Sequence, residues 1–156
     1  MIDHARFVSA GPGDAEVVLT LNQALFTEDG LNAFPLADRQ RAIETLLQKP
    51  GRWGEIWLIQ DGETVVGYTI LTWGFTVELG GRFVLVDELY LRPSHRGRGW
   101  GGTTLDFIAD RAIHHRCVAV QLEVEHHNTH ARAVYERCGF RPHASRTTME
   151  WRLGNV

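Results

Sequence analysis

The residues best suited to chemistry lie in one short stretch that combines two arginines with four glycines, Arg96 to Gly102. A helix is expected directly after it, because apolar residues recur at helical spacing at Leu105, Ile108, Ala109, Ala112 and Ile113. The first N–H groups of a helix lack partners within the helix and carry partial positive charge, so they can bind phosphate. Glycines allow the main chain to come close to a ligand, and guanidinium groups match phosphate oxygens. The stretch therefore predicts a phosphate-binding turn.

Three kinds of phosphate-binding turn use glycines at characteristic spacing. A P-loop requires a Gly-Lys pair, which this chain lacks. A dinucleotide-binding turn requires G-x-G-x-x-G, which Gly97, Gly99 and Gly102 satisfy, but only 54 residues follow Gly102 in a chain of 156. Those residues are too few for the remaining β-α units of a dinucleotide-binding fold. The third pattern, R-x-x-G-x-G, is formed by Arg96, Gly99 and Gly101.

Two carboxylates occupy the segment that leads into this turn. Residues 84–91 are apolar except for Asp87 and Glu88, and they predict a largely buried strand that ends before Pro93. Because side chains alternate along a strand, the two acids are expected to point to opposite faces of the sheet. A carboxylate can accept a proton from a reacting group, so either acid is a candidate general base.

A second pattern lies downstream of the turn. Asn128, Ala131, Tyr135 and the pair Gly139-Phe140 fit N-x-x-A-x-x-x-Y-x-x-x-G-F. Together with R-x-x-G-x-G and the strand before it, this pattern resembles the GNAT superfamily, the GCN5-related N-acetyltransferases. The order and spacing of the two patterns and the length of the chain agree with that family. The resemblance implies the GNAT fold, in which the fourth and fifth strands splay apart, and acetyl-CoA as the cofactor.

The resemblance assigns cofactor contacts to particular residues of this chain. The pyrophosphate of acetyl-CoA would lie on the N–H groups of Gly97 to Gly102, with Arg96 and Arg98 beside it. The pantetheine arm would pair with the main chain of Leu89 to Leu91 in the manner of an added strand. The implied cofactor-binding residues are Leu89, Tyr90, Leu91, Arg96, Gly97, Arg98, Gly99, Trp100, Gly101, Gly102 and Asn128.

The resemblance also implies that an amine attacks the thioester directly, without a covalent enzyme intermediate. An alkylammonium group has a pKa of about 10.4, so a carboxylate must collect its proton. Both Asp87 and Glu88 are candidates, and we favour Glu88 slightly, as the base or as an anchor for the amine. A main-chain N–H near Leu89 would stabilise the oxyanion. Tyr135 occupies the position of the family's general acid, although its spacing also fits a core aromatic.

The acceptor is expected to be a small primary amine, because Asp87 to Leu91 resembles the branch that acetylates diamines and spermidine-like compounds. Glu28 falls in a loop expected over residues 26–35 and would favour a cationic acceptor. Trp73 and Phe75 would line the acceptor pocket, although packing within the sheet explains them equally well. The alternatives are a protein N-terminal or lysine acetyltransferase, and a CoA-binding module without catalysis.

The elements that position these residues follow from periodicity and turn signals. Strands are predicted over residues 4–9, 54–60, 64–73, 84–91 and 118–125, followed by a closing pair that starts at Phe140 and includes 147–153. Helices are predicted from Asp14 to Leu25, over 36–48, after Gly102, and from Asn128 to Gly139. The order β-α-α-β-β-β-α-β-α-β-β predicts the α/β (α+β) class. We expect a mixed sheet with helices on both faces, in a single domain, 1–156.

Composition excludes several other kinds of protein. The net charge of −3 argues against general nucleic-acid binding. The sequence contains no run of 18 apolar residues, so no membrane span is predicted. Two cysteines without an export signal indicate the cytoplasm. His126, His127 and His130 are separated by the expected start of a helix, and the chemistry needs no metal, so no metal site is predicted. Many members of the family are homodimers, so the resemblance implies a homodimer.

Overall fold

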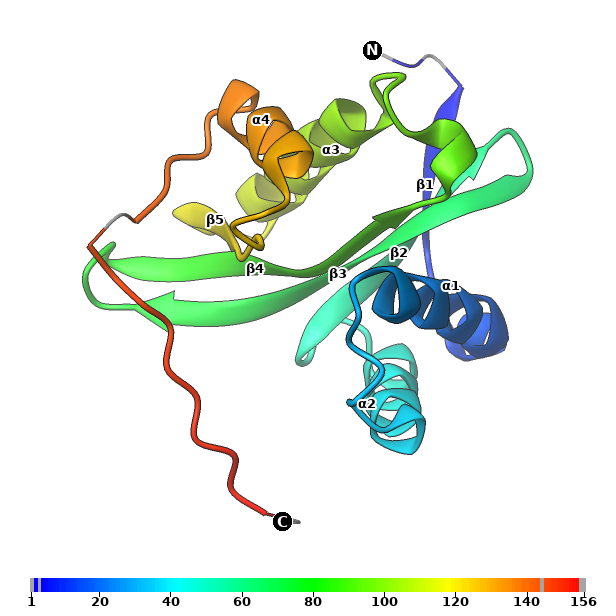
Figure 1. The fold of residues 1–156 in the computed structure, drawn as a ribbon, viewed down its shortest axis with the longest axis horizontal. Helices are drawn as coiled ribbons and strands as arrows, with labels where there is room; N and C mark the ends of the chain where they lie inside the picture. Colours follow the sequence, from blue (N-terminus) through cyan, green and yellow to red (C-terminus); the bar gives the residue numbers. More distant parts are fainter. Residues whose placement is uncertain (1, 3, 144, 155–156) are drawn as a thin grey trace.

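The strands of the sheet lie side by side in the order of the sequence, β1-β2-β3-β4-β5 (Figure 1). This computed structural model describes residues 2, 4–143 and 145–154. Its strands are β1 (Ala5–Ser9), β2 (Gly54–Asp61), β3 (Thr64–Thr76), β4 (Gly81–Leu91) and β5 (Ala119–Leu122). Its helices are α1 (Ala15–Glu28), α2 (Leu36–Gln48), α3 (Trp100–His114) and α4 (Thr129–Arg137), with short 3-10 turns η1 (Pro12–Asp14) and η2 (Pro93–His95).

The sheet is mixed because its last connection differs from the others. Strands β1 to β4 pair antiparallel with their neighbours, whereas β5 pairs parallel with β4. A parallel pair needs a crossover, and α3 supplies it. Helices α1 and α2 lie on one side of the sheet and α3 and α4 on the other (Figure 1). The predicted mixed sheet with helices on both faces is therefore confirmed.

Two apolar clusters hold these layers together, one on each face of the sheet. The first joins α1 and α2 to β2, β3 and β4, and includes Val18, Leu21, Ile43, Leu47, Tyr68, Ile70 and Tyr90. The second joins α3 to β3 and β4, and includes Leu71, Val84, Val86, Leu105 and Ile108. Among the described residues, no helix has both the length and the apolar character needed to cross a bilayer.

A β-bulge in β4 decides how the functional face of the sheet is built. Ile70 of β3 pairs with Glu88, but the next residue, Leu71, pairs with Val86, so Asp87 is the extra residue of the bulge. Residues two apart in a regular strand point to the same face. Here Val86 packs with α3, whereas Glu88 accepts hydrogen bonds from Asn22 on α1. The bulge therefore reverses the alternation of side chains at Asp87.

The same position marks the end of pairing between β4 and β5. The last pair is Val86 with Leu122, and β4 continues for five more residues to Leu91. From Asp87 onward, β4 thus has a main-chain edge that β5 does not cover. We call the space between this edge and the chain that follows Leu122 the notch. Pairing between the fourth and fifth strands thus ends where β5 ends, and the splay of the two strands that the resemblance implies stays a prediction.

Some predicted boundaries were wrong. The loop expected from Phe26 is helical as far as Glu28, because Phe26 extends the buried face of α1 and packs against Phe34 and Arg39. Strand β5 ends at Leu122 rather than at Glu125.

The closing pair of strands is not formed, since residues 140–143 and 145–154 contain no strand. Apolar and polar side chains alternate in this segment as they do in a strand. A strand also needs a neighbouring strand whose main chain can form hydrogen bonds with its own.

A polar cluster fastens the C-terminal half of α3 to the sheet. Glu55 of β2 accepts hydrogen bonds from Arg111 at 2.7 and 3.1 Å and from the Trp57 indole at 2.8 Å, and it contacts His115 at 2.8 Å. Burial alone would raise the pKa of Glu55, but these bonds outweigh it and lower the pKa. The cluster fixes the direction of α3, and with it the position of the turn at the helix's N-terminus.

Replacement of Gly67 by alanine is expected to loosen the joint between β3 and the free edge of β4. Gly67 pairs with Leu91, and a Cβ atom there would lie 2.2 Å from the carbonyl oxygen of Tyr90. Overpacking of this kind costs about 1–3 kcal/mol, which corresponds to a loss of roughly 2–12 °C in Tm for a chain of this size.

Thermal unfolding measures the Tm of Gly67→Ala, and Gly13→Ala is the matched control, because a Cβ atom at Gly13 meets nothing within 4 Å. Equal Tm values for the two variants would contradict the close approach.

Candidate active site

The turn between β4 and α3 has the conformation that its glycines permit. Gly97 and Gly99 have φ angles of 69° and 89°, in the left-handed region that side chains disfavour. Gly99 is the N-cap of α3, and its carbonyl accepts the first helical hydrogen bond, from Thr103 at 3.0 Å. The N–H groups of Trp100, Gly101 and Gly102 therefore open the helix without partners inside it. Such N–H groups are suited to an anion, and phosphate binding at this turn stays a prediction.

Trp100 anchors the turn with its side chain. Its indole is 2% exposed and packs with Ile59 and Val66. The rings of His4 and His95 meet it edge-on at 5.8 and 5.3 Å, and both histidines contact the carboxylate of Asp61, at 3.3 and 3.2 Å. Because its side chain is buried, Trp100 can contact a cofactor only through its main chain.

The three side chains of Glu28, Tyr90 and Arg96 meet where α1 approaches the turn. Arg96 donates to the Leu91 carbonyl at 2.8 Å and to the Glu28 carboxylate at 2.7 Å. Its guanidinium lies 5.3 Å from the centre of the Tyr90 ring, and the Tyr90 hydroxyl is 3.4 Å from Glu28. Arg98 donates to the Ser94 carbonyl at 3.3 Å. The structure thus places Glu28 beside the phosphate turn.

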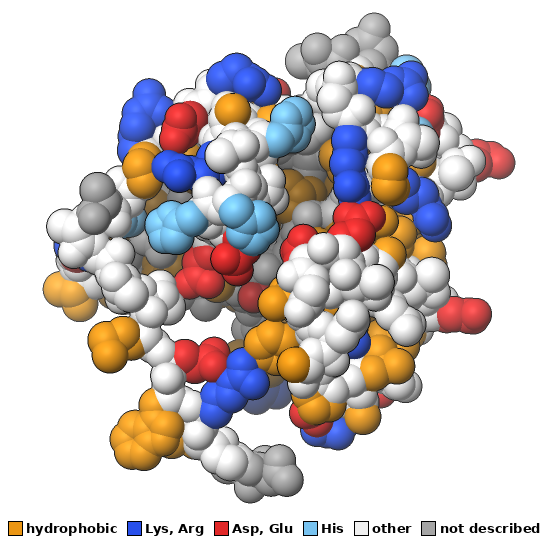
Figure 2. All heavy atoms as spheres, in the orientation of Figure 1, with side chains coloured by type: hydrophobic (Ala, Val, Ile, Leu, Met, Phe, Trp, Pro, Cys, Tyr) orange, Lys and Arg blue, Asp and Glu red, His pale blue; other side chains and the backbone are white. Residues whose placement is uncertain are grey.

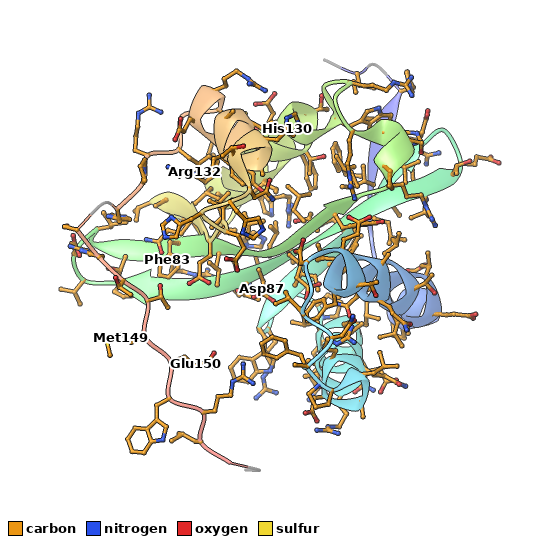
Figure 3. The ribbon with its side chains drawn as sticks, in the orientation of Figure 1. Phe83, Asp87, His130, Arg132, Met149 and Glu150 are labelled. Atoms are coloured by element: carbon orange, nitrogen blue, oxygen red, sulfur yellow. The ribbon has the colours of Figure 1, made fainter. Side chains whose placement is uncertain are left out.

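Asp87 stands where the notch begins (Figure 3). Solvent reaches its side chain, but the walls of the notch still remove part of its hydration, and this desolvation raises the pKa of its carboxyl group. The charge of Glu123, just after β5, raises that pKa further. Within residues 2, 4–143 and 145–154, no hydrogen bond engages the Asp87 carboxylate. A carboxylate with a raised pKa and open lone pairs is suited to accept a proton.

Glu88 is held on the opposite face by a polar network that the sequence analysis missed. The amide of Asn22 donates to both carboxylate oxygens at 3.0 Å, and the Tyr68 hydroxyl donates at 2.5 Å. Arg39 in turn donates to the Asn22 side chain at 2.5 Å. Burial raises the pKa of Glu88 in spite of these bonds, and burial together with the Glu88 charge raises that of Tyr68.

A signal for this network was present in the sequence. Asn22 follows Leu21 on the apolar stripe of α1 and is 1% exposed. A buried amide needs hydrogen-bond partners, so a polar residue on an apolar stripe marks a candidate network.

Tyr135 of α4 packs at the edge of the apolar cluster between α3 and the sheet. It is half-buried and lies 5.8 Å, ring to ring, from Phe140. Burial, and then the nearby charge of Asp29 at the end of α1, raise the pKa of its phenol, which keeps it protonated at neutral pH. Asn128 accepts a hydrogen bond from the Ala131 N–H at 3.2 Å, as expected for the N-cap of α4.

Trp73 and Phe75 are not brought to these groups. Trp73 pairs with Val84, stacks on His115 at 4.4 Å and donates to the Gly51 carbonyl at 3.0 Å. Phe75 lies further along β3 toward its hairpin with β4, and it is 71% exposed. Their predicted role in an acceptor pocket stays a prediction without a contact that supports it.

The surroundings of the notch are acidic. Burial and then the charge of Glu123 raise the pKa of Asp87. Burial and then the charges of Glu28 and Glu125 raise the pKa of Asp29. Figure 2 shows a hollow on this face with carboxylate and histidine side chains around its rim. Such a field attracts a cationic amine.

The chain matches the Acetyltransferase (GNAT) family over residues 20–140. An N-acetyltransferase of Bacillus subtilis (strain 168), YhfO, itself uncharacterized, is 29% identical over 85 residues. The thialysine N-epsilon-acetyltransferase of Bos taurus is 28% identical over 97 residues. These matches cover 54% and 62% of this chain, and the chain spans only 57% and 52% of the two relatives.

Solved structures share the fold over nearly the whole chain. The integron cassette protein HFX_CASS3, from the mobile metagenome of Cole Harbour Salt Marsh, is 33% identical with a TM-score of 0.80, covering 98% of this chain and 92% of that one. A predicted acetyltransferase from Clostridium acetobutylicum, solved with acetyl-CoA, has a TM-score of 0.78 at 15% identity, covering 94% and 96%. At that identity the likeness concerns the fold alone.

Replacement of Arg96 by glutamine is expected to weaken the binding of CoA. A hydrogen bond to a charged group contributes about 1.5–3 kcal/mol, so the Kd should rise about 10- to 100-fold. Glu28→Gln should have the opposite effect, because it removes a negative charge beside the diphosphate and releases Arg96. For an exposed ion pair the gain is at most about fivefold.

Isothermal titration calorimetry at constant ionic strength measures both effects, with Glu16→Gln on the exposed side of α1 as the control. A wild-type Kd for Arg96→Gln would remove this arginine from the site.

Proposed function

We propose that this chain, which belongs to the Acetyltransferase (GNAT) family, is a single N-acetyltransferase domain that transfers the acetyl group of acetyl-CoA to a primary amine of a small molecule. The observation that carries the proposal is the notch. It joins a free strand edge, an anion-binding turn at one end and a carboxylate with a raised pKa at the other. This is the arrangement that a long phosphorylated thioester needs beside a proton acceptor.

The residues on the donor side fit acetyl-CoA. The N–H groups at the start of α3, with Arg96 and Arg98, would hold the diphosphate, and the free edge of Leu89 to Leu91 would pair with the pantetheine amides. Bound acetyl-CoA supplies the activated acetyl group. A main-chain N–H near Leu89 would stabilise the negative charge that develops on the acetyl oxygen.

Asp87 is our candidate for the general base. The amine nitrogen forms a bond to the acetyl carbon, the bond from that carbon to sulfur breaks, and Asp87 takes the proton that the amine loses. The sequence slightly favours Glu88, but both oxygens of its carboxylate already accept hydrogen bonds from Asn22, and one accepts a third from Tyr68. We therefore assign Glu88 to positioning, since its bonds hold β4 against α1.

Tyr135 is our candidate for the general acid. Its phenol is kept protonated by burial and by Asp29, and its proton would go to the departing thiolate of CoA. Tyr135 and Asp87 stand on α4 and β4, the two walls of the notch, so one group receives a proton while the other gives one.

A small cationic acceptor is supported by the acidic surroundings of the notch and by the name of one relative. Glu28, Asp29, Glu123 and Glu125 surround the notch, and the relative from Bos taurus is named for thialysine. We also propose that the protein forms the homodimer that the resemblance implies and that it acts in the cytoplasm.

An amine panel tests the proposed activity by release of free CoA thiol from acetyl-CoA. Small diamines and amino-acid amines are expected to react faster than peptides with a free N-terminus or lysine. Tyr135→Phe should lower kcat by about 10² to 10⁴ without weakening CoA binding, because the phenyl ring keeps its packing against Phe140. Thiol release from peptides alone would favour a protein acetyltransferase, and an unchanged kcat for Tyr135→Phe would return this residue to the core.

The pH profile of kcat/KM is expected to show the ionisation of Asp87. A raised pKa places its acidic limb above the ordinary range of an aspartate, and activity falls as pH drops through that pKa. Asp87→Asn should remove the limb and lower kcat/KM by about 10² to 10⁴. Glu123→Gln removes the charge that raises this pKa, so the limb should move to lower pH. Glu125→Gln, whose charge acts on Asp29 instead, is the matched control. A limb that persists in Asp87→Asn would assign it to another group.

A further inference from the structure

Arg39, near the start of α2, is a half-buried arginine without a carboxylate partner. Its Nη1 donates to the side-chain oxygen of Asn22 at 2.5 Å. Among the described residues, no Asp or Glu forms an ion pair with it. A charged group that is partly removed from water loses hydration energy, and an ion of opposite charge restores it. The guanidinium of Arg39 is therefore suited to an anion that comes from outside the chain.

Arg111, another half-buried arginine, shows how this chain satisfies such a group. It forms a bidentate pair with Glu55, from Nε at 3.1 Å and from Nη2 at 2.7 Å. In Arg39 the same edge is open: within residues 2, 4–143 and 145–154, its buried Nε has no hydrogen-bond partner and its Nη2 forms no hydrogen bond. Because these two nitrogens form the fork that binds both oxygens of a carboxylate, Arg39 retains a complete carboxylate-binding edge.

The free edge of Arg39 is held in a fixed position. The central carbon of the guanidinium lies 4.3 Å from the centre of the Phe26 ring, and Phe26 meets Phe34 edge-on at 6.1 Å. The contact with the ring and the hydrogen bond to Asn22 together restrict the side chain before any ligand arrives, which lowers the entropic cost of binding. The two rings also offer apolar surface beside the guanidinium, to which methylene groups of a ligand can pack.

Arg39 lies close to the proposed general base. Burial raises the pKa of Glu88, the charge of Asp87 raises it further, and the charge of Arg39 opposes the rise, so both charges act on the same carboxyl group. Two successive hydrogen bonds, of 2.5 and 3.0 Å, connect Arg39 through Asn22 to Glu88, which follows Asp87 in the chain. A short aliphatic chain can therefore span from an amine at Asp87 to an anion at Arg39.

We propose that Arg39 binds a carboxylate of the acceptor, and that the acceptor is a small amino acid whose primary amine is separated from its carboxylate by a short aliphatic chain. This inference rests on the proposed function and names its substrate class. The carboxylate pairs with Nε and Nη2 of Arg39, and the amine faces Asp87. Each end of such a zwitterion meets a group of opposite charge.

The two ends of this acceptor make the proposal distinguishable from simple attraction of cations. The carboxylates around the notch favour the more positive of two acceptors. On their own they favour the carboxamide of an amino acid over the amino acid itself, because the carboxamide lacks the negative charge. A bidentate bond to Arg39 reverses that preference.

The first test measures kcat/KM for release of CoA thiol with γ-aminobutyrate, δ-aminovalerate and ε-aminocaproate, each beside its own carboxamide. The wild type is expected to favour the acid by about 10- to 100-fold at the best chain length. Arg39→Gln should reduce this ratio to about one or below. Arg39→Lys keeps the charge without the fork and should retain part of the preference.

Arg41→Gln is the matched control, because Arg41 lies on the same helix, is exposed and pairs with Asp38. It should keep the wild-type ratio of acid to carboxamide. A wild type that prefers the carboxamides would overturn the proposal. An equal loss for acid and carboxamide in Arg39→Gln would do the same, since it would limit Arg39 to supporting the network around Glu88.

A binding measurement separates this inference from the proposed activity. Protein saturated with CoA is titrated calorimetrically with ε-acetamidocaproate, the product expected from ε-aminocaproate, and with the carboxamide of that product. Tighter binding of the acid that is lost in Arg39→Gln would support the carboxylate site even if no amine released thiol. Equal Kd values for the two compounds would contradict the site even if acetylation of amines were rapid.

Discussion

The bulge at Asp87 is the constraint on which the rest of the site depends. One extra residue in β4 reverses the alternation of side chains, so Glu88 turns toward α1 while Val86 packs under α3. Pairing with β5 stops at the residue before the bulge, which leaves the following stretch of β4 with an open edge. The main-chain hydrogen-bonding groups on that open edge of β4 are available to a ligand.

Charge is distributed unevenly around this open edge. The turn at α3 offers main-chain N–H groups and two arginines, whereas the carboxylates of Asp87 and Glu123 interact where the notch begins. Glu28, at the end of α1, lies beside the turn and is bonded to Arg96. An anion is therefore favoured at the turn and a cation near Asp87, which supports our proposal that a phosphorylated donor and an amine acceptor approach Asp87 from different directions.

The sequence predicted those parts of the molecule that depend on local pattern. The turn at Arg96 to Gly102 and the four helices follow from glycine spacing and apolar periodicity, whereas the family rests on the resemblance of two sequence patterns and is confirmed. The bulge at Asp87 and the network around Glu88 did not, because they depend on which residues of β3 and α1 lie opposite. The closing strands were predicted wrongly for a related reason, since alternation cannot say whether a neighbouring strand is present.

The two adjacent carboxylates show how the same residue chemistry takes different roles. Burial raises the pKa of both Asp87 and Glu88. The carboxylate of Glu88 accepts hydrogen bonds from Asn22 and Tyr68, so its protonation would break bonds that hold β4 to α1. At Asp87, burial and then the charge of Glu123 raise the pKa, so protonation there relieves repulsion instead of breaking a hydrogen bond. We therefore propose that accepting a proton costs less free energy at Asp87 than at Glu88. The bulge places these two adjacent side chains in different environments.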